Sequence, residues 1–267
     1  MKRLYDITKG LLGEMVKEEH IELNKYLKPE ECKTLKDIYE QALSSLCNRD
    51  RMSKYINFNR YRICNYINFE RRNQLKELLF DFNPVKVKEK YGERWEPLIA
   101  AFNEKIGLKI EPQEKKSRLW VIFGKGVISS AIFLSEFKDK KDFDDFVKSF
   151  QKNKYYREAL PMLLDKEIFG FGFALACDFL KEAGYVSYAK PDVHLMDIFK
   201  ESRLCKKNDA DYKVFKTIIE LAEVVGKTPY EVDKRIWLVC TGNFYLDKEP
   251  TNKKKGKKKE LLRLLSE

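Results

Sequence analysis

Asp192 is the residue of this sequence best placed to do chemistry. It stands in Lys-Pro-Asp-Val-His at 190–194, twenty residues after Gly172. Proline disfavours helix at the preceding residue and fits the first turn of the next helix, so a helix is expected to start here. The dipole of that helix favours an ionised carboxylate, which can act as a general base or stabilise a developing positive charge. The alternative role is an ordinary capping aspartate.

The segment Gly170–Gly172 interrupts a helical pattern. Apolar residues recur at helical spacing over 155–165 and again over 173–183, where Gly184 is the expected C-cap. The sequence therefore predicts a helix, a tight turn and a second helix. Glycines let the backbone approach another molecule closely, and the N–H groups that begin the second helix can bind a phosphate. A plain connection between two helices is the alternative.

Helical periodicity extends through most of the chain. Apolar residues recur at helical spacing in the further segments 35–46, 143–150 and 215–222. A capping box with proline at the first helical position starts another helix at Thr228. Two short stretches, 62–68 and 119–122, could be strands or helices, and alternating strand patterns are otherwise scarce. The sequence therefore predicts a mainly α fold.

The chain is strongly basic. It has 267 residues, of which 43% are hydrophobic, and a formal net charge of +11. A chain of this length can bury a substantial core, and its charge favours an anionic partner. Nucleic acid is the first candidate partner, and an anionic membrane surface is the second.

The sequence shows no membrane or export signal of the common kinds. No run of about 18 apolar residues occurs, so no transmembrane helix is expected. The first residues lack the apolar segment and small-residue cleavage site of a secretory signal. We therefore expect a protein that is not secreted and acts in the cytoplasm, at the nucleoid in a prokaryote.

A polar segment that contains proline, 107–117, predicts a boundary in the chain. We expect a mostly helical N-terminal region (1–117), a helical core (118–246) and a Lys-rich tail (247–267) that lysine repulsion keeps disordered. The stretch Arg51–Gln74 interleaves Arg and Lys with Tyr, Phe and Asn. Such a mixture could grip a phosphate backbone and stack on bases, or form an ordinary half-buried element with a solvated basic face.

The six cysteines are dispersed along the chain and form no Cys-x-x-Cys pair. This spacing argues against a structural zinc site and against an iron–sulfur cluster with closely spaced ligands. We expect reduced cysteines that serve as small core residues.

The order helix, Gly-x-Gly turn, helix, glycine, short loop and Pro-Asp-Val-His resembles the helix-hairpin-helix (HhH-GPD) DNA glycosylase superfamily. That family includes endonuclease III and the adenine-mismatch, 8-oxoguanine and alkylpurine glycosylases. Gly170 and Gly172 match the hairpin glycines of its motif, and Ala176 matches the alanine that follows. Asp192 matches the catalytic aspartate, and His194 matches the histidine after it.

The resemblance extends more loosely over 119–245. Within it, the segment Asp233–Phe244 is similar to a late helix of the family that carries an Asp and a Trp. Residues 1–110 do not align. The resemblance implies a mainly α, two-lobed, all-helical fold with a helix-hairpin-helix motif, to which the N-terminal region would contribute one lobe.

The same resemblance implies a DNA glycosylase that acts in base excision repair or on foreign modified DNA. Such an enzyme flips a damaged or modified base out of the strand and hydrolyses its N-glycosidic bond. Asp192 would stabilise the positive charge on the sugar or orient the attacking water. Gly170, Phe171, Gly172 and Lys190 would contact the DNA, whether duplex or single strand.

No cofactor is expected. The family's iron–sulfur ligands would follow the late helix, and no cysteine occurs after Cys240. No catalytic metal is needed, although a hairpin of this type can hold a structural monovalent cation between its carbonyls and a DNA phosphate. A monomer without membrane contact is expected.

Ala174 departs from the family pattern. Members that also cut the strand carry a lysine at this position, which forms a Schiff base with the sugar. Alanine cannot be a nucleophile, so the sequence predicts a monofunctional glycosylase. Two alternatives stay open. Lys166, Lys181 or Lys190 could supply a lyase amine, or the chain could be a DNA-binding protein without enzymatic activity.

The pocket for the base is less well defined by the sequence. The second helix of the motif carries Cys177 and Asp178, either of which could lie near the flipped base. Trp237, Trp120 and Phe123 could stack on it. The alternatives are a solvated helix charge for Asp178 and core packing for the aromatic residues. The sequence does not specify which base is removed.

Overall fold

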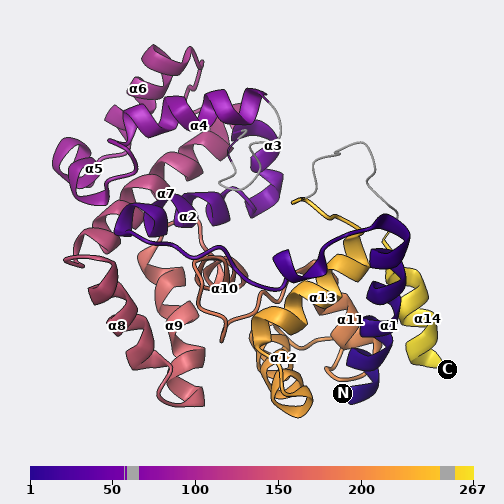
Figure 1. Cartoon of the computed structure of the whole chain (residues 1–267). Coiled ribbons are helices and arrows are strands. Elements are labelled where there is room, and N and C mark those ends of the chain that lie inside the picture. Colours follow the sequence, from indigo (N-terminus) through magenta and orange to yellow (C-terminus); the bar gives the residue numbers. More distant parts are fainter. Residues whose placement is uncertain (57, 59–65, 247–255) are drawn as a thin grey trace. The chain divides into compact units, whose positions relative to one another are not determined.

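The computed structural model describes the whole chain except residues 57, 59–65 and 247–255 (Figure 1). Helices, turns and loops make up the described residues, and no strand occurs among them. The predicted mainly α fold is confirmed. Residues 119–122 and 66–68, for which strand and helix were both open, lie in helices, and 62–65 lie outside the described residues.

The α-helices, in chain order, are α1 (Lys2–Glu19), α2 (Leu35–Leu46), α3 (Ser53–Ile56), α4 (Tyr66–Leu78), α5 (Pro84–Tyr91), α6 (Glu96–Ile106), α7 (Arg118–Ser135), α8 (Lys140–Phe150), α9 (Lys154–Glu167), α10 (Phe173–Glu182), α11 (Val193–Glu201), α12 (Asp211–Val225), α13 (Pro229–Thr241) and α14 (Lys258–Ser266). Short 3-10 helices occur at η1 (Leu23–Lys25), η2 (Arg49–Arg51) and η3 (Lys115–Ser117).

The chain folds into two compact units. Unit 1 combines Met1–Glu30 with Leu180–Glu267, and unit 2 is the continuous segment Glu31–Phe179, so the boundary falls inside α10. The sequence predicts different divisions, after residues 117 and 246. The difference arises because α1 packs on α12, α13 and α14, a long-range association that leaves no local signal in the sequence.

Unit 1 is built around the apolar face of α1. Leu4, Leu11, Leu12 and Met15 are buried at helical spacing on that face. They share one core with buried residues of α11, α12 and α13, among them Phe199, Ile218 and Ile236. The first helix therefore holds together the C-terminal part of the chain, which carries Asp192.

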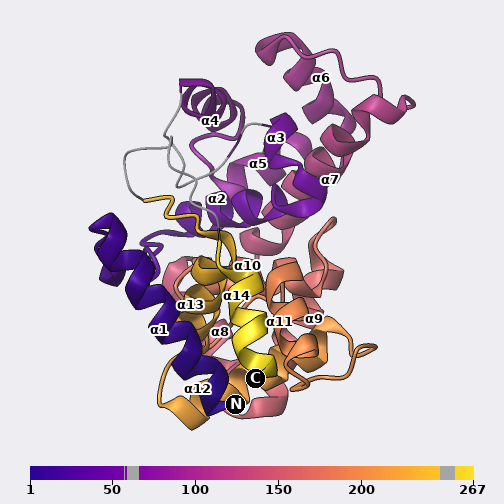
Figure 2. The same cartoon turned by 90° about the vertical axis from the view of Figure 1, so that its right-hand side faces the viewer.

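The prediction of a disordered tail is wrong for the last residues of the chain, which are helical. Lys258–Ser266 forms α14, which lies beside α1 in both ribbon views (Figures 1 and 2). Repulsion between the lysines does not keep this segment unfolded, because Leu261 is fully buried and two lysines form ion pairs. Lys257 lies 2.8 Å from Glu14, and Lys258 pairs with Asp197. Residues 247–255 lie outside the described residues.

In unit 2, α7 is the central helix. It contacts α2, α5, α6 and α9. The segment Lys115–Ser135 is long and apolar enough to cross a membrane by length and composition, with a mean hydropathy of 1.4. Half of that apolar window is buried inside the protein, and the Tyr39 hydroxyl donates a hydrogen bond of 2.8 Å to the Val127 carbonyl. These contacts are typical of a core helix.

Gly126 lets α7 approach the turn before α10. A Cβ built at Gly126 would lie 2.9 Å from the Phe169 carbonyl oxygen and would also collide with the Leu46 side chain. Gly10, in α1, is helical too, but a Cβ built there meets nothing within 4 Å. The two glycines therefore allow a matched test of this close approach.

We predict that Gly126→Ala lowers the free energy of unfolding by ~1–3 kcal/mol, the usual cost of overpacking, despite the better helix propensity of alanine. Gly10→Ala should raise that free energy by ~0.5–1 kcal/mol, since alanine replaces an exposed helical glycine. Urea unfolding followed by circular dichroism measures both. Equal effects of the two substitutions would contradict the close packing at Gly126.

Candidate active site and nucleic-acid interface

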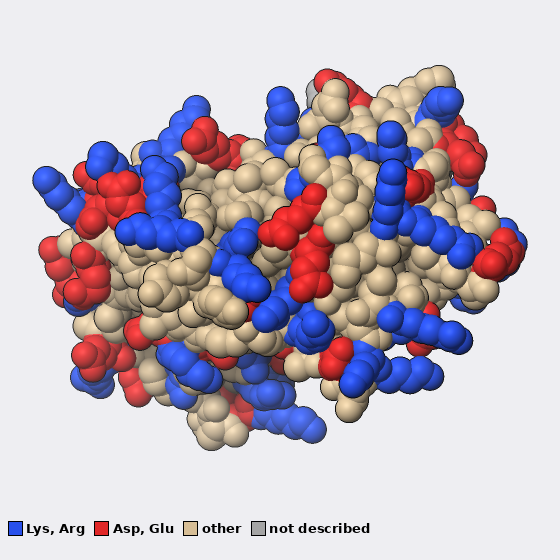
Figure 3. Space-filling model, turned by 90° about the horizontal axis from the view of Figure 1, so that it is seen from below, with Lys and Arg blue, Asp and Glu red and all other residues tan. Residues whose placement is uncertain are grey.

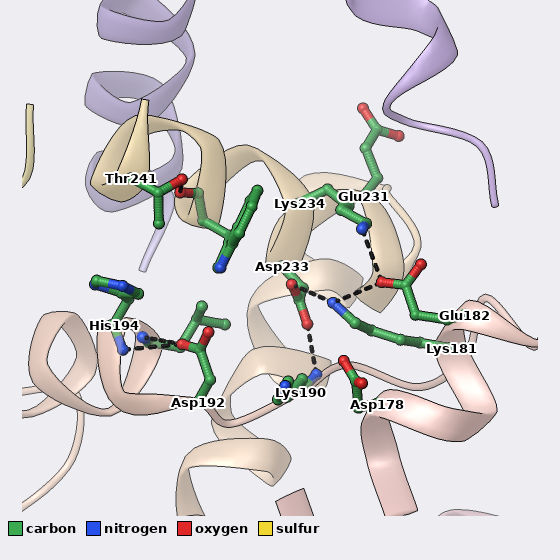
Figure 4. A network of polar contacts seen from close by, with 12 residues as sticks. Asp178, Lys181, Glu182, Lys190, Asp192, His194, Glu231, Asp233, Lys234 and Thr241 are labelled. Carbon is green, nitrogen blue, oxygen red and sulfur yellow. Dashed lines mark hydrogen bonds and ion pairs between the residues drawn. The ribbon is translucent and has the colours of Figure 1, made fainter. Parts of the chain in front are cut away.

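Asp192 is the N-cap of α11. Its Oδ1 atom accepts hydrogen bonds from the amides of His194, at 2.9 Å, and Leu195, at 3.0 Å (Figure 4). Its Oδ2 atom has no hydrogen-bond or ion-pair partner among the described residues, and the side chain is only half-buried. One carboxylate oxygen therefore caps the helix while the other stays available, so capping and chemistry do not exclude each other.

The backbone before Asp192 is fixed by a buried carboxylate of α13. Asp233 accepts the Lys190 amide hydrogen with Oδ2, while its Oδ1 lies 2.8 Å from the Lys181 ammonium (Figure 4). The Lys181 and Asp233 side chains are 5% and 1% exposed. The Asp192 amide itself donates to the Lys190 carbonyl at 2.8 Å, which closes a tight turn around Pro191. These hydrogen bonds therefore fix the backbone of the loop immediately before Asp192.

A second ion pair supports the first. The Lys234 ammonium lies 2.7 Å from Glu182 and 2.9 Å from the Tyr245 hydroxyl, and Glu182 also lies 3.4 Å from Lys181. Two lysines and two carboxylates from α10 and α13 thus share one buried cluster. The cluster ties the end of α10 to α13 on the side where the Asp192 loop begins.

Burial raises the pKa of Asp233, and the Lys181 ammonium and the Lys190 amide oppose that rise. The nearby charge of Asp192 raises it further. Burial also raises the pKa of the Cys240 thiol, to about 12, with a contribution from Asp192. Both effects favour the protonated thiol, which is a poorer nucleophile than the thiolate.

The glycine turn, residues 168–172, joins α9 and α10 in unit 2. Gly170 has a φ of 88°, a left-handed conformation that favours glycine. The Arg49 guanidinium donates to the Gly170 carbonyl at 2.7 Å, and the Phe169 amide donates to the Ser129 hydroxyl at 2.8 Å. The predicted arrangement of helix, tight turn and helix is present, and hydrogen bonds with residues of η2 and α7 hold it in place.

Gly172 differs from Gly170. Its φ is not positive, and a Cβ built on it would meet nothing within 4 Å. The protein itself therefore does not demand glycine at this position. Its carbonyl accepts from the amides of Leu175 and Ala176, which starts α10 directly behind it. The open space in front of the first turn of α10 is suited to a ligand that approaches the backbone closely, such as a phosphate.

The predicted contact residues fall into different environments. The Phe171 ring is 5% exposed and packs 5.9 Å from Phe179, so only its backbone can meet a ligand. Cys177 is fully buried. Asp178 is 4% exposed, and its Oδ2 atom accepts a hydrogen bond of 2.9 Å from the side-chain amide of Asn48. The solvated-charge alternative for Asp178 is wrong, because the carboxylate joins α10 to the end of α2.

The predicted aromatic pocket residues mainly pack against other rings. Phe123 is fully buried, and Trp120 and Phe102 lie within 6.3 Å of it, measured between ring centroids. Trp237, in unit 1, lies 5.9 Å from Tyr245. These contacts agree with the alternative of core packing. Stacking of Trp120 or Trp237 on a base stays a prediction.

Sequence patterns do not reveal several residues that shape these sites. Asn48 and Arg49 reach the turn and α10 from the loop after α2, where Asp50 adopts a positive φ of 47°. The sequence indicates Lys181 only as a possible lyase amine. Asp233 lies in the segment similar to the family's late helix, and this was the one signal that could have pointed to it.

The basic, aromatic stretch Arg51–Gln74 is described only in part, since residues 57 and 59–65 lie outside the described residues. Arg72 forms a bidentate ion pair with Glu40. The Arg71 guanidinium lies 5.5 Å from the centroid of the Trp120 ring. Arg72 is thus structural, and nucleic-acid binding by the remainder stays a prediction.

Charge is distributed rather than gathered in one patch on the face shown in Figure 3. Lysine and arginine side chains outnumber acidic ones there, but Asp and Glu stand among them. The described residues contain no group of three or more His, Cys, Asp or Glu side chains placed to hold a metal ion. The cysteines at positions 32, 47, 177, 205 and 240 are buried and are not in disulfides, and Cys64 lies outside the described residues.

Comparison with known proteins gives one informative similarity. The chain is 28% identical over 113 residues to an 8-oxoguanine DNA glycosylase/AP lyase of Thermoplasma volcanium. The match covers 41% of this chain and 53% of that relative, so it spans about half of the relative's length. No family model and no solved structure matches the chain. The similarity supports a relationship to DNA glycosylases.

We predict that Lys181→Met costs ~3–5 kcal/mol of unfolding free energy, because it leaves the buried Asp233 carboxylate without its partner. The double variant Lys181→Met with Asp233→Asn should recover much of that loss. Its asparagine is neutral and can still accept the Lys190 amide hydrogen. Urea unfolding at pH 7 measures both variants.

The loss in Lys181→Met should also depend on pH. The folded-state pKa of Asp233 is already raised by burial, and removal of Lys181 raises it more. A carboxyl whose folded pKa is raised favours the folded state at low pH and loses that contribution as the pH rises through the folded pKa. The loss of unfolding free energy in Lys181→Met, relative to the wild type, should therefore grow as the pH rises from 4. A double variant no more stable than the single one would contradict the pairing.

Proposed function

We propose that this chain is a DNA glycosylase, which hydrolyses the N-glycosidic bond of a damaged or modified base flipped out of the strand. The observation that carries the proposal is the half-buried carboxylate of Asp192, with one oxygen in the helix cap and the other without a partner among the described residues. The motif residues and the similarity to a named glycosylase/AP lyase support it.

The chemistry follows from the free oxygen. Cleavage of a glycosidic bond builds positive charge on the sugar, and a fixed carboxylate lowers the energy of that state. The same oxygen can accept a proton from an attacking water. Because Asp233 and the α11 cap fix the loop on both sides of Pro191, Asp192 needs little reorganisation at the moment of reaction.

DNA binding would use the glycine turn. Gly172 and the start of α10 offer backbone groups and open space to a phosphate, without reading base sequence. Lys190 would add a positive charge near Asp192. A base stacked in a duplex is out of reach, so the enzyme acts on a flipped or unpaired nucleotide.

The enzyme is proposed to be monofunctional, in contrast to the name of its relative. Ala174 stands where a strand-cutting member carries lysine. Lys181, one of the alternative amines, is buried and paired with Asp233 and Glu182, so its ammonium is not free to attack a sugar. The first base to test is 8-oxoguanine, because the relative is named for it.

We predict that Asp192→Asn lowers the single-turnover rate of base release at least ~100-fold, as expected for loss of a general base or of a stabilising charge. Stability should hardly change, because asparagine caps a helix as well as aspartate does. Asp192→Ala should lose the activity and in addition ~1 kcal/mol of unfolding free energy. Duplexes and single strands that each carry one modified base, treated with alkali after incubation, report the release.

The two substitutions separate the roles of the side chain. An Asp192→Asn variant that releases base at the wild-type rate would leave Asp192 as a cap only. If the wild-type protein binds these DNAs but releases no base from any of them, the chain is a DNA-binding protein without glycosylase activity.

The monofunctional assignment gives a separate prediction. Wild-type protein should cut its substrate strand only after alkali, and borohydride should trap no protein–DNA adduct, because no lysine forms a Schiff base. Gel electrophoresis of the reaction with and without borohydride measures this. A trapped adduct would overturn the assignment, and peptide mapping would then identify the lysine.

A further inference from the structure

Phe169 stands directly before Gly170, and 47% of its surface is exposed. The backbone of this residue is fixed, since its amide donates to Ser129 and its carbonyl lies against Gly126. A single exposed apolar ring is common on protein surfaces and is not by itself a binding site. The groups around this ring decide whether it can meet a ligand.

A lysine lies beside this ring. The Lys125 ammonium, from α7, is 5.2 Å from the centroid of the Phe169 ring and 5.0 Å from that of Trp95, the residue before α6. Among the described residues, Lys125 has no carboxylate partner. Two aromatic faces hold the cation in place, an arrangement that positions its charge without neutralising it.

Three segments distant in sequence thus bring one cation and two aromatic rings to the glycine turn. A nucleic-acid strand offers the complementary groups, a phosphate for the ammonium and the face of a base for the ring. Bases in an intact duplex are stacked on each other, so an exposed ring stacks most readily on an unpaired base.

We propose that Trp95, Lys125 and Phe169 form a binding surface for a single nucleic-acid strand beside the glycine turn. Lys125 contacts a phosphate, and Phe169 stacks on an unpaired base next to it. The inference rests on the proposed function, because it takes the glycine turn as the neighbouring phosphate site. It adds that the protein binds unpaired nucleotides in preference to intact duplex.

The test measures binding of a fluorescent single-stranded DNA oligonucleotide to the full chain by anisotropy, over a series of salt concentrations. Lys125→Gln should flatten the slope of log K against log salt by about 0.7, the contribution of one phosphate of a single strand. Phe169→Leu should weaken binding about 5- to 100-fold, the range for loss of one stacked base, with the slope unchanged.

The chain offers a matched control at the other end of α9. Tyr155 is 66% exposed, and the Lys154 ammonium lies 5.1 Å from the centroid of its ring. It lies roughly 20 Å along the helix from the turn, at 1.5 Å per residue. Lys154→Gln and Tyr155→Leu remove the same chemistry, and both should bind single-stranded DNA as the wild type does.

Wild-type binding by both Lys125→Gln and Phe169→Leu, in variants whose thermal unfolding matches that of the controls, would overturn the proposed surface. If one of these two variants does not fold, wild-type binding by the other is enough to overturn the proposed surface. Base release by the wild type is measured separately. A protein that releases bases but is insensitive to both substitutions keeps the proposed function and loses this surface. A protein that is sensitive to both but releases no base keeps the surface and loses the enzyme.

Discussion

The buried ion pair between Lys181 and Asp233 is the interaction on which the candidate active site depends. Both side chains are almost completely removed from water, and water is what normally stabilises such charges. A buried pair adds little net stability compared with apolar packing, so its effect here is geometric. Lys181 balances the charge of the carboxylate that accepts the Lys190 amide hydrogen, and that amide lies two residues before Asp192.

The two roles predicted for Asp192, helix cap and reactive group, can be carried by different atoms of one carboxylate. Oδ1 satisfies two amides at the start of α11, and Oδ2 has no partner among the described residues. Capping therefore supports chemistry, because the helix holds the carboxylate in a fixed orientation and its dipole favours negative charge. A residue whose local pattern reads as an ordinary cap can still be the reactive group.

Local patterns predict much of this protein and fail at defined places. Pro191 and the glycines 170 and 172 locate the turn and the start of α11, because proline and glycine restrict the backbone wherever they occur. The pairing of Lys181 with Asp233 joins residues 52 positions apart, and no periodicity signals it. The same holds for α1 with α13, and for α14, whose lysines find carboxylates only in the folded unit.

The division of unit 1 between the two ends of the described chain has a consequence for biosynthesis. Unit 2 is one continuous segment, so its internal contacts can form once that segment has left the ribosome. The apolar face of α1 must wait for α12 and α13, some 200 residues later, which is about 10–40 s at ordinary rates of translation. The first of the described helices to be made is thus among the last to be buried. Until then its leucines are exposed apolar surface, the kind of surface that promotes aggregation during folding.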